Sequence, residues 1–391
     1  MRRDFYTRLD EEINTLKQKG TYKNFKYNTN ALDGKINVEG FGEEIVLCSN
    51  NYIGLANHPE VIKAAHEALD KYGAGASSVR FICGTYDIHR TLEERIARFL
   101  GMEAAITYSS CWAANTACIP ALLVDGDAVI SDELNHASII DGCRSVAKGV
   151  KRAVYTHSDI ADLEEKLKET SDSGAVLVVT DGVFSMEGDI AKLPEIIGLC
   201  KKYNALLMVD DSHATGVIGE TGRGAMEYYR LKEGVDIISG TFGKALGGAG
   251  GGFIAASKSI CAMLAQRSRP HLFSNCLPPV LCAIALAAID YLDTHPEIVA
   301  SLTEKTRYMR RKIKALGLNP LEGDSAIIPI IIGDTAKAIG ISEKMMSAGV
   351  FTIGFGFPVV PEGKARVRLQ ISDALSYEEL DQALAVIQKA F

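Results

Sequence analysis

Lys244 stands in a setting that favours covalent chemistry at its side-chain amine. It lies in the small-residue segment GTFGKALGG (240–248), directly after VDIIS (235–239), an apolar run typical of a buried strand. Burial disfavours the charged ammonium form, lowers the pKa of the amine and prepares it to form a Schiff base. A loop lysine on its own would be ordinary, so the interpretation depends on the residues that accompany it.

Two neighbouring strand candidates also end in side chains that can react. The run AVLVVT (175–180) leads into Asp181, and ALLMVD (205–210) ends in Asp210, with His213 close behind. Ligands of open α/β sheets bind beyond the carboxyl ends of the strands, so these groups and Lys244 are expected on one rim. A lysine for the imine, an aspartate for the pyridine nitrogen and a nearby histidine suit pyridoxal 5′-phosphate (PLP). Alone, Asp210 would most often be a cap and His213 a polar loop residue; their spacing before a glycine-flanked lysine favours the functional interpretation.

The segment YSSCW (108–112) offers a site for the phosphate of such a cofactor. It lies between the apolar run AAITY (104–108) and a predicted helix at 113–123. Free backbone N–H groups and the positive end of a helix dipole favour a dianion there. The glycine run at 247–252 does not match a dinucleotide loop, because position 253 is Phe and a strand follows. A P-loop is excluded because Ala follows Lys244.

Three further polar residues have more than one interpretation. His136, in LNHAS (134–138), is equally suited to a helix cap or to stacking on a flat cofactor near the same rim. Arg366 and Arg368 alternate in ARVRLQ (365–370), so in a strand both share a face and could bind a substrate carboxylate. A solvated strand face is the alternative, especially for Arg366.

The pattern of elements predicts an α/β fold with two lobes. Apolar runs at 104–108, 128–131, 175–180, 205–210, 236–239 and 252–256 alternate with helical segments. This alternation is typical of a mainly parallel sheet that is covered on both faces. From about residue 279 the pattern changes to an α+β lobe. We therefore expect an N-terminal helix and arm at 1–45, a large domain at 46–278 and a C-terminal α+β domain at 279–391.

Composition excludes several classes of function. The formal charge of −7, without a basic stripe, argues against nucleic acid as a partner. No apolar run is long enough to cross a bilayer, and no signal segment is recognisable. The nine cysteines and eight histidines show no zinc spacing, so no metal is expected. Scattered, unpaired thiols predict a reduced, cytoplasmic protein.

With these residues in hand, the chain resembles the α-oxoamine synthases over nearly its whole length. The matching segments include SNNYIGL (49–55), NHAS (135–138), TDGVFSM (180–186), VDDSHA (209–214) and GTFGKA (240–245). The resemblance implies a PLP-dependent transferase of the aspartate-aminotransferase type, fold type I. It also implies a homodimer in which Ser274 reaches the phosphate of the neighbouring subunit.

The same resemblance implies a role for each site residue. Lys244 would hold PLP and move the substrate's α-proton, and Asp210 would pair with the pyridine nitrogen. The ring and its hydroxyl would be contacted by His136, His213 and Ser185. The phosphate would be bound at Ser110, Cys111, Trp112 and Thr241, although Trp112 stands where phenylalanine is expected. The substrate carboxylate would be bound by Asn50 and Arg368.

Segments SVRFICGT (78–85), RSRPHLFSN (267–275) and PVVPEGKAR (358–366) narrow the expected reaction. They resemble the family members that condense glycine with acetyl-CoA to give 2-amino-3-oxobutyrate and CoA. Joining of a pimeloyl thioester to alanine, as in biotin synthesis, is the nearest alternative. Aminotransfer is a third possibility from another reaction class. That the product keeps its carboxylate follows from the resemblance alone.

Overall fold

The computed structural model describes residues 2–391, and the chain forms two compact units. Unit 2 comprises Asn50–Ser185 and Asp189–Thr303. Unit 1 comprises the residues up to Ser49, the short segment Met186–Gly188 and Glu304–Phe391. The expected domains 1–45, 46–278 and 279–391 stay a prediction.

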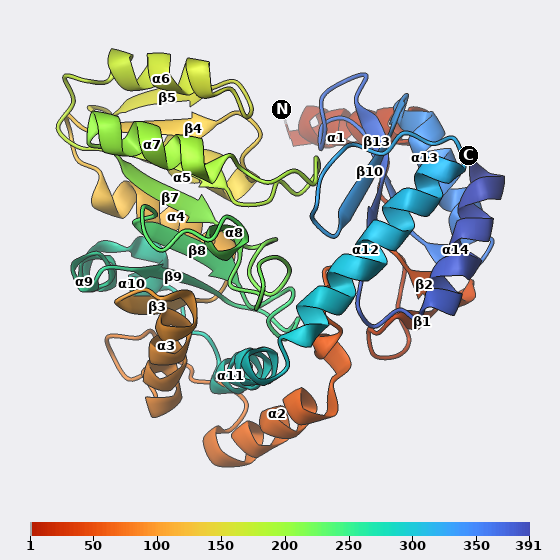
Figure 1. Cartoon of the computed structure of the whole chain (residues 1–391), viewed down its shortest axis with the longest axis horizontal. Helices are drawn as coiled ribbons and strands as arrows, with labels where there is room; N and C mark the ends of the chain where they lie inside the picture. Colours follow the sequence, from red (N-terminus) through yellow and green to blue (C-terminus); the bar gives the residue numbers. More distant parts are fainter. Residues whose placement is uncertain (1) are drawn as a thin grey trace. The chain divides into compact units, whose positions relative to one another are not determined.

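Unit 2 is built on a seven-stranded sheet in the order β3-β9-β8-β7-β6-β4-β5 (Figure 1). Pairing is parallel between β4, β5, β6, β7 and β8, whereas β9 runs antiparallel to both β8 and β3. The amino end of β9 therefore lies at the same edge as the carboxyl ends of the other strands. The strands are Ala104–Tyr108 (β3), Ala128–Asp132 (β4), Lys151–Tyr155 (β5), Val176–Asp181 (β6), Leu206–Asp210 (β7), Ile237–Thr241 (β8) and Gly252–Ala256 (β9).

Both faces of this sheet are covered, as the continuous apolar runs predict. Successive side chains of a strand point to opposite faces, yet Leu177 and Val178 are both buried, as are their neighbours along β6. Helix α4 packs against α5, α9 and α10, and α6 packs against α7 (Figure 1). The helices of unit 2 include Pro59–Tyr72 (α2), Asp87–Leu100 (α3), Cys111–Leu122 (α4), Ala137–Arg144 (α5), Ile160–Glu169 (α6), Leu193–Tyr203 (α7), Ala225–Tyr228 (α8), Lys258–Arg267 (α9), Arg269–Phe273 (α10) and Pro279–Thr294 (α11), with a 3-10 turn at Leu55–Asn57 (η1).

Unit 1 contains two small sheets. In one, β13 (Ala365–Gln370) lies antiparallel between β10 (Ile327–Gly333) and β12 (Ile353–Phe355). In the other, β2 (Gly42–Val46) pairs with β1 (Lys35–Val38) and, in parallel, with β11 (Val350–Phe351). The accompanying helices are Arg2–Gln18 (α1), Thr335–Met346 (α13) and Tyr377–Ala390 (α14), while Glu297–Ala315 (α12) begins in unit 2 and continues into unit 1.

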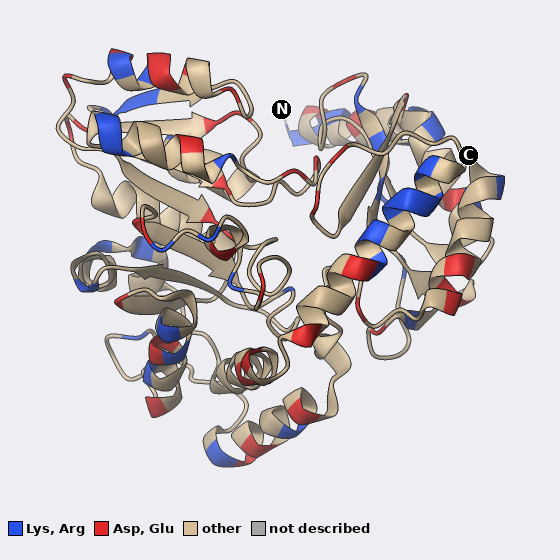
Figure 2. Cartoon of the chain, in the orientation of Figure 1, with Lys and Arg blue, Asp and Glu red and all other residues tan. Residues whose placement is uncertain are grey.

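The described part of the chain contains no helix that could span a membrane. Charges of both signs are interspersed along the helices of both units (Figure 2).

Candidate active site

Three adjacent strands end side by side at the edge where the sequence predicts the site. In the register of the sheet, Asp181 of β6 is opposite Asp210 of β7, and Asp210 is opposite Ser239 of β8. Strand β8 continues to Thr241, from which the chain turns to Lys244. Parallel strands that share an edge thus bring the predicted carboxylate and lysine segments together.

Asp210 is held by hydrogen bonds from two other segments. Asn115 Nδ2, from α4, donates to its Oδ2 at 2.5 Å, and the Ser212 N–H donates to Oδ1 at 2.9 Å. The Cys111 thiol lies 3.7 Å from Oδ2. Asp210 is only 4% exposed, so these neighbours fix the direction of its carboxylate. Asn115 was not predicted from the sequence, although a buried asparagine one turn after Cys111 in an otherwise apolar helix is a usable signal.

Asp181 is a second buried carboxylate of this rim. Its Oδ2 accepts the backbone N–H of His136 at 3.0 Å, and its own N–H donates to Asn135 Oδ1 at 2.8 Å. Burial raises its pKa well above the ordinary value, and the negative charge of Asp210 raises it further. Lys244 and the His136 N–H act in the opposite direction. The lysine and the two carboxylates therefore lie close enough to affect one another electrostatically.

His136 caps helix α5, which is one of the two interpretations its sequence allows. Its Nδ1 lies 2.7 Å from Ser138 Oγ and accepts the Ser138 N–H. Its ring is 5.8 Å from that of Trp112, at an interplanar angle of 79°. Desolvation lowers the pKa of the ring, which favours neutral imidazole, although the residue as a whole is exposed. Stacking on a cofactor stays a prediction that this exposure allows.

The amino end of α4 is the candidate phosphate site. The Ser110 hydroxyl caps the helix by accepting the Ala113 N–H at 3.1 Å. The N–H groups of Cys111 and Trp112 lie in the first turn, where a helix offers no acceptor. A Cβ added to Gly252 would lie 2.3 Å from the Cys111 nitrogen, so only glycine lets β9 come this close. The Thr241 hydroxyl donates to the Gly251 carbonyl at 3.1 Å, which places it beside the same strand.

His213 is buried and its Nδ1 lies 2.7 Å from the Tyr52 hydroxyl. Tyr52 is another residue that was not predicted; its signal is its place in NNYIG (50–54), beside the predicted Asn50. Both residues belong to unit 2, as do Lys244, Ser185 and Ser274. Lys244 and Ser185 are half-buried, whereas Ser274, directly after α10, is exposed.

The two arginines of β13 have different surroundings within unit 1. Arg366 pairs with Glu187 at 2.8 Å and donates to the Met186 carbonyl at 2.8 Å. Arg368 donates to Gln370 Oε1 at 2.8 Å, and its guanidinium carbon lies 4.7 Å from the centre of the Phe355 ring. Both are buried, so neither lies on a solvated strand face. Substrate binding by Arg368 stays a prediction.

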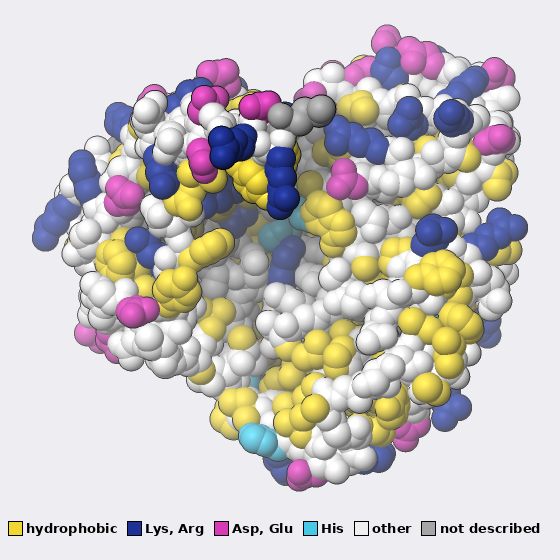
Figure 3. Space-filling view, turned by 180° about the vertical axis from the view of Figure 1, so that it is seen from behind, with side chains coloured by type: hydrophobic (Ala, Val, Ile, Leu, Met, Phe, Trp, Pro, Cys, Tyr) yellow, Lys and Arg dark blue, Asp and Glu magenta, His cyan; other side chains and the backbone are white. Residues whose placement is uncertain are grey.

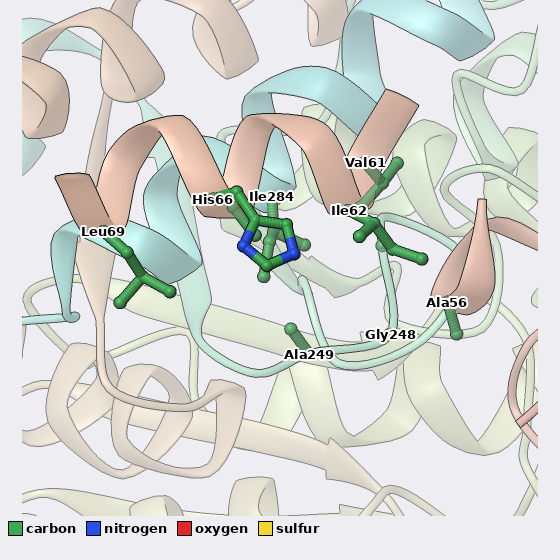
Figure 4. Close-up of a pocket in the computed structure, with 10 residues that line it drawn as sticks. Ala56, Val61, Ile62, His66, Leu69, Gly248, Ala249 and Ile284 are labelled. Carbon is green, nitrogen blue, oxygen red and sulfur yellow. The ribbon is translucent and has the colours of Figure 1, made fainter. Parts of the chain in front are cut away.

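An apolar pocket adjoins the glycine loop that follows Lys244 (Figure 4). Helix α2 contributes Val61, Ile62 and Leu69, and Ile284 comes from α11. The backbone of Gly248 closes one side, where an added Cβ would lie 2.8 Å from Ala56. The loop that follows Lys244 therefore packs closely against Ala56 at Gly248.

Residues 43–387 match the aminotransferase class I and II family. The chain belongs to that family. Within it, the chain is 47% identical to the 2-amino-3-ketobutyrate coenzyme A ligase of Salmonella typhimurium, over 98% of this chain and 96% of that one. It is 48% identical to the mitochondrial enzyme of the same name from Bos taurus, over 96% and 90% of the two chains. It is 44% identical to the 8-amino-7-oxononanoate synthase of Thermoanaerobacter pseudethanolicus, over 97% and 96%.

Solved structures agree with the family. A serine palmitoyltransferase from S. paucimobilis, with bound PLP and myriocin, superposes with a TM-score of 0.93 at 30% identity, over 99% of this chain and 97% of that one. The prediction of fold type I and the resemblance to the α-oxoamine synthases are both confirmed.

The residues at this edge of the sheet fit PLP. A dianion suits the amino end of α4, whose first N–H groups have no acceptor within the helix. A fixed carboxylate, Asp210, suits a protonated ring nitrogen, and Lys244 suits an aldehyde. The structure thus offers groups that suit the phosphate, the ring nitrogen and the aldehyde of the cofactor.

Proposed function

We propose that the protein is a glycine C-acetyltransferase, which condenses glycine with acetyl-CoA to give 2-amino-3-oxobutyrate and CoA. The relatives named 2-amino-3-ketobutyrate coenzyme A ligase support this reaction, since they match almost the whole chain. The single structural observation that supports it best is the group Asp181, Asp210 and Lys244 at one edge of the sheet. PLP is the cofactor, as the family and the PLP-bound serine palmitoyltransferase indicate.

When bound, PLP supplies an electron sink for the carbanion of glycine. In our proposal, Lys244 holds the cofactor and then takes the α-proton of glycine on its amine. Asp210 holds the proton of the pyridine nitrogen, and the short bond from Asn115 keeps its carboxylate oriented. The new carbon–carbon bond forms as the C–S bond of the thioester breaks, and the proton on Lys244 passes to the CoA sulfur, so that CoA leaves as the thiol.

The remaining roles concern binding and orientation. The phosphate is held by Ser110, Cys111, Trp112 and Thr241, with Ser274 from a second subunit. The ring and its hydroxyl are contacted by His136, His213 and Ser185. Asn50 and Arg368 bind the carboxylate of glycine, which keeps the amino acid in one orientation for proton removal.

Replacement of Lys244 by alanine tests the reaction. We expect loss of turnover and of the absorbance that PLP acquires when it is bound to a lysine. Lys192→Ala, which removes a surface amine that donates to a backbone carbonyl, serves as the matched control and should stay active. Full activity of Lys244→Ala would contradict the proposed mechanism.

A pimeloyl thioester with alanine is the alternative substrate pair, because a relative named 8-amino-7-oxononanoate synthase is also 44% identical. Release of CoA should be measured with glycine and acetyl-CoA, and separately with alanine and pimeloyl-CoA. We expect the first pair to react faster; the reverse order would favour the alternative. An aminotransferase would instead convert bound PLP to its pyridoxamine form with an amino acid alone.

We infer that the protein is a homodimer. Phe81, Ile82 and Phe273 are 63%, 68% and 70% exposed, and the backbone of Cys276 binds that of Ser78, which joins their two segments. Apolar side chains also gather on the face seen in Figure 3. An exposed apolar surface of this kind is typical of an interface between subunits.

Shared sites can be detected by mixing inactive variants. Refolding Lys244→Ala together with Ser274→Asp should restore roughly a quarter of wild-type activity, because half of random dimers are mixed and each has one intact site. A monomer by light scattering, or no recovery on mixing, would contradict the shared site.

We also propose a cytoplasmic location. All nine cysteines are free thiols, which fits a reducing compartment. Cell fractionation tests this, and enrichment in a mitochondrial fraction, where relatives are named as mitochondrial, would contradict it.

A further inference from the structure

The ring of His157 lies between two carboxylates. The residue follows β5, and its Nδ1 and Nε2 lie 3.0 Å from Asp132 Oδ1 and 3.1 Å from Asp189 Oδ2. Both nitrogens can donate at once only when the imidazole is protonated. Burial opposes that charge, but the two carboxylates outweigh it and raise the pKa of His157 to about 10.

Asp132 connects His157 to the loop that leads to His136. It is the last residue of β4 and is 2% exposed. Its Oδ1 accepts the Leu134 N–H at 2.9 Å, and its Oδ2 accepts the Ser158 N–H at 3.1 Å. One carboxylate therefore fixes the turn before His136 and also the backbone next to His157.

Asp189 connects His157 to the hairpin that carries Ser185. The Asp189 carbonyl accepts the Phe184 N–H at 3.0 Å, and Val183 pairs with Ile190 across the hairpin. The Phe184 ring packs edge-on against His157, with centres 4.4 Å apart. His157 thus contacts this hairpin through both its charge and its ring.

The other charged groups around His157 do not compete for its ring. The Glu133 carboxylate accepts the backbone N–H of His157 at 2.9 Å. Lys192, at the start of α7, donates to the Ser158 carbonyl. The two ring nitrogens therefore face Asp132 and Asp189.

We propose that His157 is a positioning residue of the active site: it joins the loop of His136 to the hairpin of Ser185 and keeps the two at a fixed separation. It forms no bond with the cofactor itself. Asp181 and Asn135 already connect the two segments beside His136. His157 connects them at a second place, through Asp132 and Asp189. The two connections together set how His136 and Ser185 face the cofactor. The inference rests on the proposed function only in that these two residues contact PLP.

The test compares His157→Gln with His295→Gln. The control histidine, at the end of α11, stacks on Tyr291 and has no carboxylate partner among the described ion pairs. For His157→Gln we expect the dissociation constant of PLP to rise about tenfold and kcat to fall by a similar factor, since small misplacements of contacting groups are costly. KM for acetyl-CoA should change less than twofold, and the control should match the wild type. Asp189→Asn, which keeps the shape and removes a charge, should show a smaller effect of the same kind.

Two outcomes would overturn the proposal. A folded His157→Gln protein that is less heat-stable, yet keeps the wild-type PLP dissociation constant and kcat, would show that the residue only stabilises the fold. Should this variant fail to fold, an unchanged PLP dissociation constant in folded Asp189→Asn would have the same meaning. PLP binding is read by absorbance without substrates, so it decides the role of His157 even if the wild type fails to condense glycine with acetyl-CoA.

Discussion

Replacement of Gly252 by alanine should weaken PLP binding and also destabilise the fold. Gly252 begins β9, where it is paired with Tyr108 on one side and Thr241 on the other. A Cβ there would lie 2.3 Å from the nitrogen and 2.5 Å from the Cα of Cys111, and 2.5 Å from the Ser110 carbonyl carbon. These are all backbone atoms, so no change of rotamer can relieve the overlap.

The size of the effect follows from these distances. Ordinary contact begins near 3.4 Å, so the amino end of α4 must move by roughly 1 Å away from β9. Overpacking of this kind costs about 1–3 kcal/mol of stability. A displacement of about 1 Å at a binding or reacting centre can cost on the order of 100-fold. We therefore expect the PLP dissociation constant to rise between ten- and roughly 100-fold.

Gly198→Ala is the matched control. This glycine lies inside α7, and an added Cβ meets nothing within 4 Å. Alanine favours a helix interior over glycine by about 1 kcal/mol, so the control should melt at the same or a higher temperature and bind PLP normally. PLP affinity is measured by titration of the cofactor absorbance, and stability by calorimetry. Wild-type PLP affinity in a folded Gly252→Ala protein would refute the reasoning.

Two further predictions concern buried polar groups. Asn115→Ala removes the 2.5 Å donor to a buried oxygen of Asp210, so stability should fall by about 1–3 kcal/mol and PLP should bind more weakly. Asn115→Asp places a second carboxylate beside Asp210 and should weaken PLP binding further. Unchanged PLP binding in both variants would contradict the role of this hydrogen bond. His157, whose pKa is raised from 6.5 to about 10, binds a proton in the folded state across this interval that the unfolded chain has lost. Its contribution is complete below pH 6.5 and disappears as the pH rises through about 10, with a slope of up to ~1.4 kcal/mol per pH unit. Thermal unfolding of the wild type should therefore lose more stability over this range than that of His157→Gln, and parallel pH profiles would contradict it.

The position of the site at the carboxyl ends of the strands was predictable. Apolar runs indicate buried strands, and parallel strands end at the same edge of a sheet. Asp210 and Lys244 each follow such a run directly. The antiparallel direction of β9 was not predictable, because an apolar run does not show in which direction its strand runs. The close approach of Gly252 to Cys111 depends on this direction, so it could not be predicted either.

The role of His157 could not be predicted for a different reason. The strand that precedes it, β5 (KRAVY, 151–155), was not among the predicted strands, since it begins with two charged residues. The partners of His157 also lie 25 and 32 residues away in the chain, and no local spacing pairs them with it. Tyr52 and His213 are similar, at a separation of 161 residues. The roles of Ser274, Asn50 and Arg368 stay predictions that variants must test.

The division of the chain also has a consequence for the order of events during synthesis. Unit 2 is complete once residue 303 has left the ribosome, whereas unit 1 needs residues up to 391. Strand β2 emerges early, but its parallel partner β11 follows about 300 residues later. For that time one edge of β2 has no strand to pair with, and such an edge is a template for pairing between chains. Chaperone protection of nascent chains should thus matter most at the amino-terminal strands.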